Sequence, residues 1–548
     1  MERLARTATP ARIDTLGQLA RGGSAAIRQL ALEGLAHTGE TLAVDRSLLT
    51  DSDEGLRAVT AAAVLAAAPG DPAALAVLRE PLQPNAALGA IAVLRSRARD
   101  TAVGVLMAMG QHSDAAVRAA ALGAAAAMST YSSEILAWAK QSSLDTAPVV
   151  REAAFAILIR ATPVQQLDAV MEAGLGDRAF QVRQAVIAAL DTRGTDAVPG
   201  LYLQLNSNNE EAQLAAIEAL GRIQGAGAEE GLYRMFETNV FPAIELHRQL
   251  TQLFQPGRPG WAAMSFALDN TREHALRLMM HALEALGHRK VLNLVRTMLN
   301  VSDERARANA IESLASLPQR RFVVPLSSLF DDDIGPHDGD AFNVARAKDV
   351  LRLAQASSDE ALRAATAIAW HAETGDIPAG ALNDPSELVA GTVHGLKHRT
   401  DLACPYQQEA PMNRLAFLHS VPLFADATLD DLIVIDRTLS CETYVDGERI
   451  VTEGDPGDRL CIVYRGEVVV RKRMPDGERE LARLSASDFF GEMSLFDDEP
   501  RSATVAAVNE VEVLVLNRDR FHSLVHQRPS ILIELCTTLV RRLRKAVG

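Results

Sequence analysis

The residues best suited to binding chemistry lie between Phe490 and Val505, in the segment FGEMSLFDDEPRSATV. A glycine followed by a short helical turn, as at Gly491, exposes backbone N–H groups that can bind an anion. Arg501 comes nine residues after Glu492 and can return to the same point, where its guanidinium would match two oxygens of a phosphodiester. Glu492 beside that anion needs a different partner, and a ribose hydroxyl fits. The spacing therefore predicts a site for a phosphate with a sugar hydroxyl next to it.

Short segments of period 2 surround this site and predict the strands that position it. They are Arg449–Thr452, Arg459–Tyr464, Glu467–Lys472, Glu480–Leu484, Ala503–Ala506 and Val511–Leu516. Glycine-containing turns separate them, and short strands joined in this way are typical of a small barrel or jelly roll. Flanking helices are expected at Asn413–Phe417, Leu429–Thr438, Arg518–His526 and Pro529–Lys545.

The first four hundred residues carry a different pattern, which repeats. Each copy has an acidic or polar start, an apolar residue followed by Arg, and then Ala or Leu at helical spacing. The Arg position falls at Arg28, Arg57, Arg118, Arg151, Arg183, Gln213, Arg307 and Arg363. The apolar positions make one face of a helix, and a single helical pair cannot bury that face alone. Neighbouring pairs are therefore expected to stack into a superhelix.

This D-x-x-x-R core resembles the HEAT-repeat family over roughly residues 20 to 400. The resemblance implies that Asp and Arg of successive repeats form a structural ladder, so these arginines are interpreted as structural. The amino end lacks an obviously polar capping repeat. Three explanations stay open: this end meets a protein partner, it meets a dimer mate, or it marks where a longer polypeptide was cut. The acidic loop at 331–340 lacks the spacing of an EF-hand and is expected to be solvated.

The last part of the chain, from Leu415 to about Lys545, resembles the cyclic-nucleotide-binding domain of kinase regulatory subunits, gated channels and bacterial cAMP-responsive regulators. The resemblance rests on an ordered set of motifs. They are V-P-L-F at 421–424, Y-x-x-G-x-x-I at 444–450, G-D-x-G-D at 454–458, G-E-V at 466–468 and the phosphate-binding cassette F-G-E-M-S-L…P-R-S-A-T-V. Such a set is far more specific than one glycine motif.

The resemblance implies roles for individual residues. Arg501 would pair with the cyclic phosphate and Glu492 would accept from the ribose 2′-OH, while the Ser494 amide and the Gly491 backbone complete the cradle. Ser502 would add a hydroxyl to the phosphate or reach the base, which is compatible with cAMP or cGMP, and cAMP is favoured. The implied ligand-binding set is Gly491, Glu492, Met493, Ser494, Arg501, Ser502 and Ala503.

In the family, the helix after the barrel closes over the base. Here that helix would be Pro529–Lys545, with Leu535, Leu539 or Arg542 as candidate lid contacts. The alternative is a degenerate copy of the domain that no longer binds. Such copies usually lose the Glu or the Arg, and both are present in this chain.

Composition and charge exclude several other functions. A net charge of -15 over 548 residues argues against a nucleic-acid binder. The sequence contains no apolar stretch of the ~20 residues that a membrane span needs. Cys404, Cys441, Cys461 and Cys536 form no C-x-x-C or Cys/His cluster, so neither a metal site nor a redox pair is expected, and a reducing setting is the simplest interpretation. No P-loop, G-x-S-x-G or H-E-x-x-H motif occurs, so no catalysis is expected.

The sequence thus predicts a multidomain chain. An all-α HEAT-like superhelical solenoid at 1–400 is followed by a linker at 401–412 and an α+β cyclic-nucleotide-binding domain, a β-roll with flanking helices, at 413–548. The expected function is a cytoplasmic, cyclic-nucleotide-responsive regulatory or scaffold protein in which the ligand changes the protein interactions of the solenoid. The cytosolic regulatory portion of a bacterial membrane transporter, a constitutive scaffold and homo-oligomerisation stay open.

Overall fold

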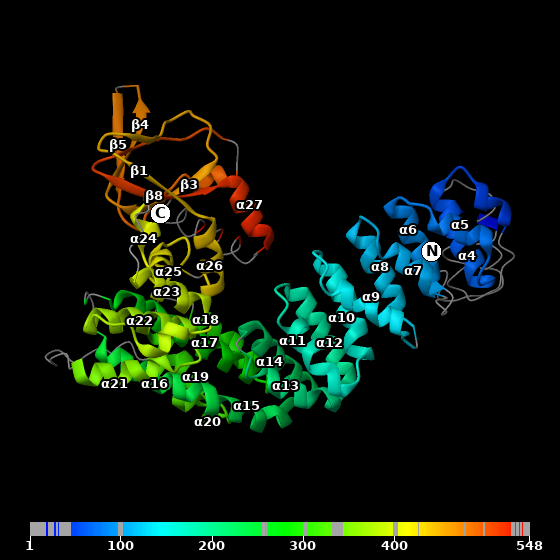
Figure 1. Cartoon of the computed structure of the whole chain (residues 1–548), viewed down its shortest axis with the longest axis horizontal. Helices are drawn as coiled ribbons and strands as arrows, with labels where there is room; N and C mark the ends of the chain where they lie inside the picture. The colour runs from blue at the N-terminus through cyan, green and yellow to red at the C-terminus, as the bar shows by residue number, and fades with distance from the viewer. Residues whose placement is uncertain are drawn as a thin grey trace. The chain divides into compact units, whose positions relative to one another are not determined.

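The computed structural model describes most of the chain, with gaps (Figure 1). The described ranges are 45–96, 102–128, 130–207, 209–254, 260–299, 304–330, 344–397, 404–425, 427–475, 477–496 and 499–527, with isolated residues 18, 19, 27, 28, 31, 258, 532, 536 and 540. The acidic loop at 331–340, the candidate lid residues Leu535, Leu539 and Arg542, and the side chain of Arg307 lie outside this description.

The residues fall into two compact units, 1–236 with 278–314 and 237–277 with 315–548. The helices with residues in the first unit are α4 (Glu54–Ala67), α5 (Pro72–Arg79), α6 (Pro84–Ser96), α7 (Val103–Met109), α8 (Ala115–Ala126), α9 (Ser133–Ser142), α10 (Pro148–Ala161), α11 (Leu167–Leu175), α12 (Phe180–Arg193), α13 (Val198–Gln204), α14 (Glu210–Gln224), α15 (Glu229–Met235), the end of α17 (Ala262–Ala285), α18 (Arg289–Leu299) and α19 (Glu304–Ala315). Alternate helices pack on one another in sequence, α4 on α6, α6 on α8, and so on to α14. The arrangement buries the Ala- and Leu-rich faces that the sequence pattern predicts.

The acidic or polar start of several copies is a helix N-cap. The Asp53 carboxylate accepts from the Leu56 amide at 2.8 Å, Asp114 accepts from Ala116 at 2.7 Å, and the Asn209 side chain accepts from Ala212 at 3.2 Å. A side-chain acceptor at this position satisfies an amide that has no partner within the helix.

The arginines of the repeat form the expected ladder. Arg118 binds Asp145 through two contacts of 2.9 Å and also donates to the carbonyls of His112 and Ser113. Arg151 binds Asp177 in the same way, at 2.7 and 2.8 Å. The corresponding pairs are Arg183–Glu211 and, within the second unit, Arg363–Asp384. These four arginines thus have structural partners, whereas Arg57 donates to the Asp51 and Ser52 carbonyls, and the interpretation of the full set stays a prediction.

The second unit joins further helices to a β-roll. The helices with residues in it are α16 (Phe241–Leu253), the start of α17, α20 (Arg320–Val323), α21 (Val344–Gln355), α22 (Glu360–Thr374), α23 (Glu387–Lys397), α24 (Pro405–Gln408), α25 (Pro411–Ser420), α26 (Leu429–Thr438) and α27 (Arg518–Gln527). One continuous apolar core runs from Leu250 and Trp261 through α22 and α23 to α25, α26 and α27.

The roll consists of two four-stranded antiparallel sheets. The strands are β1 (Ser440–Tyr444), β2 (Arg449–Val451), β3 (Arg459–Arg465), β4 (Val468–Met474), β5 (Gly477–Leu484), β6 (Phe489–Phe490), β7 (Thr504–Ala507) and β8 (Val511–Asn517). Their order is β1-β8-β3-β6 in one sheet and β2-β7-β4-β5 in the other. The six predicted strands are confirmed, with each end within three residues of the predicted one, whereas β1 and β6 were not predicted.

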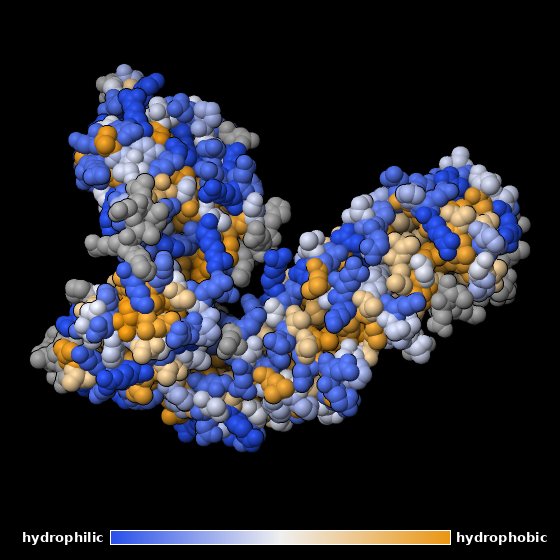
Figure 2. Space-filling model, in the orientation of Figure 1, coloured by the Kyte–Doolittle hydropathy of each residue, from blue (hydrophilic) through white to orange (hydrophobic). Residues whose placement is uncertain are grey.

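Alternate residues of the first sheet enter two different cores. Leu460 and Leu514 belong to the core shared with the helices, whereas Cys461 and Val513 pack toward the second sheet. At the edge of the second sheet, β5 has exposed side chains up to Arg483. Figure 2 shows the surface over β4 and β5, at the top of the view, as mainly hydrophilic.

The stretch that the sequence predicted to be a linker is structured where the structure describes it. Residues 404–412 contain α24 and the start of α25, and Cys404, Tyr406, Ala410 and Met412 are buried. The domain limits drawn from the sequence stay a prediction.

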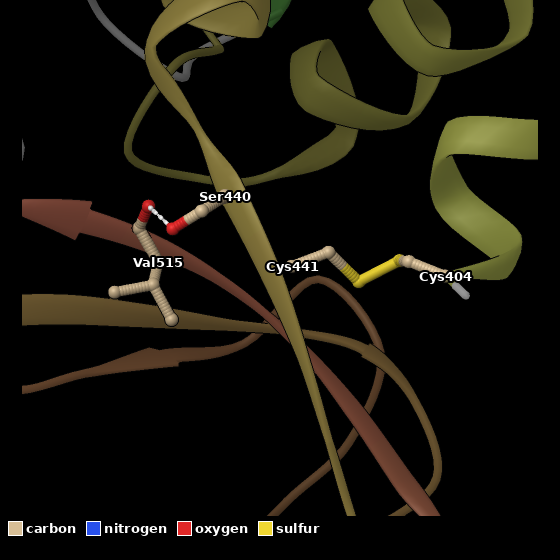
Figure 3. The surroundings of a disulfide bond; sticks show 4 residues. All are labelled: Cys404, Ser440, Cys441 and Val515. Carbon is tan, nitrogen blue, oxygen red and sulfur yellow. Dashed lines mark hydrogen bonds between the residues drawn. A yellow bond between two sulfur atoms is a disulfide. The ribbon is translucent and has the colours of Figure 1, made fainter. Parts of the chain in front are cut away.

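The predicted absence of a cysteine pair is wrong. Cys404 and Cys441 form a disulfide, with their Cα atoms 6.2 Å apart, while Cys461 and Cys536 are free thiols (Figure 3). The two cysteines are 37 residues apart, and only the packing of α24 on the roll brings them together. Local spacing in the sequence could not reveal this.

Candidate functional site

The glycine turn of the predicted site lies between β6 and a 3-10 helix, η9 (Glu492–Leu495). β6 pairs with β3, which fixes the start of the turn, with Phe490 opposite Cys461. Gly491 then adopts φ +78°, a left-handed conformation that favours glycine. The turn therefore reverses the chain so that η9 begins directly beside the end of β6.

Arg501 enters the site from the segment before β7. Its guanidinium donates from Nη2 to the Arg459 carbonyl at 2.8 Å and from Nη1 to the Gly491 carbonyl at 3.4 Å. Its backbone is also held, because its N–H donates to the Asp455 carbonyl and its own carbonyl accepts from Gly454, both at 2.9 Å. Arg501 and Gly491, ten residues apart in the chain, are thus brought together as predicted.

The Arg501 side chain is buried, and no described carboxylate forms an ion pair with it. The residue is 8% exposed, and no carboxylate among the described residues lies within ion-pair distance of it. Burial lowers the pKa of this guanidinium from its ordinary value, and the nearby Arg459 acts in the same direction. A buried charge without a partner is unfavourable, so the site favours an anion that would supply one.

Two glycines make the space that this guanidinium occupies. A Cβ on Gly491 would collide with Arg501 Nη1 and would lie 2.9 Å from the Arg459 carbonyl. A Cβ on Gly457, in the β2–β3 loop, would lie 2.9 Å from Arg501 Nε and would collide with Ser494 Oγ. The side chain of Arg501 is therefore held between two turns that only glycine permits.

The other predicted residues line the same two segments but differ in exposure. Ser494 is buried in η9, and Glu492 is half-buried one residue after the glycine. Met493 points outward, at 62% exposure, and Ser502 is exposed, while Ala503 is half-buried before β7. The structure thus gathers Gly491, Ser494 and Arg501, with Glu492 adjacent. The roles predicted for the seven residues stay predictions.

A cavity of about 400 Å³ adjoins Arg501 on the side of β1, β2 and β3. It is lined by Glu442, Ile450, Val451, Thr452, Asp455, Pro456, Asp458, Arg459, Arg501 and Asn517. Gly491, Glu492 and Ser502 do not line it, so it shares only its arginine with the predicted nucleotide site.

Arg459 and Glu442 in this cavity were not found from the sequence. Arg459 Nη1 lies 2.9 and 3.1 Å from the two Glu442 oxygens, and the Tyr444 hydroxyl donates to Glu442 at 2.5 Å. Burial and this hydrogen bond raise the pKa of Tyr444 to about 12, so the hydroxyl stays a donor at neutral pH. The pair fixes Arg459, whose carbonyl accepts from Arg501. The alternation of β3 could have revealed Arg459, because it lies on the same face of the strand as Cys461 and Val463.

Arg518 is a further residue that the sequence analysis missed. It is the first residue of α27, and its side chain donates to the Ser494 carbonyl at 2.7 Å and to the Gly457 carbonyl at 2.9 Å. Its backbone N–H donates to the Asp458 carbonyl at 2.7 Å. Arg518 therefore ties η9 and the β2–β3 loop to the helix that follows the roll.

Among the described residues, no group of three or more His, Cys, Asp or Glu side chains could hold a metal ion. Across the helices that the structure describes, none is long and apolar enough to cross a membrane.

Comparison with known proteins found a matching family for this part of the chain. Residues 441–528 match the cyclic nucleotide-binding domain family, and they form such a domain. A CRP-like cAMP-activated global transcriptional regulator of Mycobacterium tuberculosis is 41% identical over 100 residues, which are 18% of this chain and 45% of that protein. A cAMP-dependent protein kinase regulatory subunit of Dictyostelium discoideum is 35% identical over 112 residues, 20% of this chain and 34% of that protein.

Solved structures give a similar result. The N-terminal domain of a transcriptional regulator from Streptomyces coelicolor A3(2) is 37% identical, covering 24% of this chain and 92% of that chain with a TM-score of 0.23. The chain spans less than half the length of the two curated relatives named above, so the likeness concerns only a part of each protein.

Proposed function

Because residues 441–528 are a cyclic nucleotide-binding domain, we propose that this chain is a non-catalytic, cytoplasmic regulator that binds a 3′,5′-cyclic nucleotide at Gly491–Ala503. The observation that carries the proposal is the buried guanidinium of Arg501, whose hydrogen-bond partners among the described residues are the backbone carbonyls of Gly491 and Arg459. A cyclic phosphate would supply the missing counter-charge and accept two parallel hydrogen bonds.

cAMP is the favoured ligand. The two relatives named above are described as cAMP-activated and cAMP-dependent, which supports the same choice here. Glu492, adjacent to the arginine site, would accept from the ribose 2′-OH, and the exposed Ser502 would contact the phosphate or the base. A hydroxyl at this position is compatible with cGMP as well, so both nucleotides belong in the test.

The helical part of the chain is proposed to be the output. The stacked helices with their Arg–Asp ladder fit a HEAT-like solenoid, an architecture whose surface typically holds a protein partner. Within the second unit, the roll and the last helices share one core, and α23 packs closely on the start of α25, where a Cβ on Gly395 would lie 3.0 Å from Ala410 Cα. A shift in α25 would therefore reach α23 directly.

The route from the site to those helices would begin at Arg518. Its contacts to Ser494 and Gly457 couple η9 and the β2–β3 loop to α27, and α27 packs on α26 through the shared core. A ligand changes the arrangement of the helices only if it binds one arrangement more tightly than another. A ligand that contacts both η9 and α27 would meet this condition.

The test is isothermal titration of the full chain with cAMP and cGMP. We expect saturable binding of cAMP, and Arg501→Ala should weaken it by about 100-fold or more, since two charge-assisted hydrogen bonds are lost. Glu492→Gln should weaken it less. The matched control is Arg483→Ala, which removes an exposed arginine on β5 that pairs with Glu480 and Glu467. Absence of binding to either nucleotide would contradict the proposal, as would an Arg501→Ala variant with unchanged affinity.

A further inference from the structure

The Cys404–Cys441 disulfide joins two segments on which the binding domain depends. Cys404 is the N-cap residue of α24, and Cys441 lies in β1, where it pairs with Leu514 of β8 (Figure 3). The neighbouring Ser440 donates to the Val515 carbonyl at 3.4 Å. The bond closes a loop that contains α25 and α26, so it ties the helices before the roll to the first sheet.

The segment held by this bond is packed tightly at one residue. Tyr406 of α24 is 3% exposed, and its hydroxyl donates to Asp436 of α26 at 2.6 Å. Asp436 also accepts from Arg414 of α25 at 2.7 Å. The Tyr406 ring meets the edge of Tyr464 in β3, with centroids 5.1 Å apart. α24 therefore packs against α25, α26 and the first sheet, and the disulfide links its first turn covalently to β1.

A short chain of contacts leads from Cys441 to Arg501. The next residue in β1, Glu442, binds Arg459 at 2.9 Å. The Arg459 carbonyl accepts from Arg501 Nη2 at 2.8 Å. The position of β1 thus influences Arg459, whose carbonyl accepts a hydrogen bond from the buried guanidinium of Arg501.

The chemistry of the four cysteines separates this pair from the others. Cys461 is buried, and burial raises the pKa of its thiol to about 12, which makes it a poor nucleophile. Cys536 is exposed and free. Cys441 is half-buried, whereas Cys404 is buried. In a reducing compartment, disulfides are usually transient and redox-sensing rather than structural.

We propose that Cys404 and Cys441 form a redox-modification site that controls nucleotide affinity, with low-molecular-weight thiols as its reductant. The inference rests on the proposed cyclic-nucleotide function. Two thiols RSH reduce the bond by exchange through a mixed disulfide, giving two cysteine thiols and one RSSR, and an oxidised thiol RSSR reverses the reaction. The oxidised form fixes β1 and the Arg459 carbonyl, and so keeps Arg501 pre-organised for the phosphate. Reduction releases α24 from β1. Binding then becomes weaker, because the ligand must also order β1 and Arg501, which costs free energy.

The test compares titrations of the full chain with cAMP in oxidised and dithiol-reduced form. Alkylation and intact mass should show two more reactive thiols after reduction. We expect the reduced form to bind roughly three- to tenfold more weakly. Cys536→Ser should respond to reduction as the wild type does, whereas a Cys404→Ser/Cys441→Ser double variant should bind like the reduced form under both conditions.

Amide hydrogen exchange of peptides covering 404–420 supplies a second readout that does not depend on the variants folding. Exchange there should be faster in the reduced wild type. Equal affinity and equal exchange in both redox states would overturn the inference while leaving cAMP binding intact. No cAMP binding in either state would overturn the proposed function, and the inference would fall with it.

Discussion

Buried arginines occur in both regions of the molecule, and the two regions treat them differently. In the helical region, Arg151 is 6% exposed and binds Asp177 through two contacts. In the roll, Arg501 is 8% exposed, and among the described residues its guanidinium donates to two backbone carbonyls. The hydrogen bond that Arg151 donates to Asp177 raises the pKa of Arg151, whereas burial lowers that of Arg501. Two equally buried arginines thus differ in their partners: Arg151 has a carboxylate, whereas the proposed function assigns the counter-charge of Arg501 to the ligand.

The largest effect should come from breaking the paired arginine. Arg151→Ala leaves Asp177 without its partner and removes donors to the Asp145 and Thr146 carbonyls. We expect the free energy of unfolding of the helical region to fall by about 3 kcal/mol. Urea unfolding monitored by circular dichroism measures this loss. Affinity for cAMP should not change. The control is Arg222→Ala, which breaks an exposed pair with Glu218 and should leave the urea midpoint nearly unchanged. Equal losses for both variants would contradict the comparison.

A glycine substitution tests the surroundings of the unpaired arginine. Gly491 and Gly447 share φ +78°, but a Cβ on Gly491 meets Arg501 whereas a Cβ on Gly447 meets nothing within 4 Å. Both alanine variants pay the same backbone strain, of about 1 kcal/mol. Only Gly491→Ala should displace the guanidinium, and we expect it to weaken cAMP binding by more than tenfold in a titration. Similar affinities for the two variants would show that Arg501 does not carry the binding.

Arg518 offers a smaller perturbation of the same site, because it positions the cassette without lying in the predicted ligand set. Arg518→Ala removes the bonds to Ser494 and Gly457. We expect about tenfold weaker cAMP binding, since each hydrogen bond to a charged donor contributes about 1.5 kcal/mol and part is regained through water. Ligand-induced protection of α27 in hydrogen exchange should fall with it. A change in affinity without any change in that protection would limit Arg518 to a local role.

The smallest effect is a difference in acid sensitivity. The hydrogen bond from Arg118 holds the pKa of Asp145 below its ordinary value, and Arg363 does the same for Asp384. Their contribution to stability is complete above the unfolded value, near 3.9, and is lost as the pH falls through the lowered folded values. In the roll, burial raises the pKa of Glu512, so protonation of that group on acidification is favourable there. Thermal unfolding between pH 6 and pH 3 should therefore show the helical region weakening first. Asp145→Asn should reduce that loss, and an unchanged pH profile in this variant would contradict the assignment.

The sequence was sufficient where the pattern was local. Six strands of the roll were predicted from alternation, although β6, which leads into the glycine turn, was not. α26 was predicted with the bounds that it has in the structure, because Leu432 and Ile435 keep the helical spacing of its buried face. The ladder of Arg and Asp was implied by the resemblance of the repeat to a known family. β1 was missed because the segment SCETY has no apolar alternation and depends on pairing with β8.

Contacts between distant segments could not be predicted. Arg501 meets the Arg459 carbonyl across 42 residues, and the Cys404–Cys441 bond crosses 37. Tyr406 and Ala410 lie in a short Pro-containing stretch that was predicted to be a linker. Both residues are nevertheless buried, because α24 packs on the roll. In each case the deciding partner comes from tertiary packing rather than from neighbours in sequence.

The most direct test of the central claim is a crystal structure of the full chain grown with cAMP. The account predicts that the guanidinium of Arg501 lies within about 3 Å of two oxygens of the cyclic phosphate, with the Glu492 carboxylate at the ribose 2′-OH. A structure with cAMP bound elsewhere, while Arg501 still contacts only the Arg459 and Gly491 carbonyls, would contradict it.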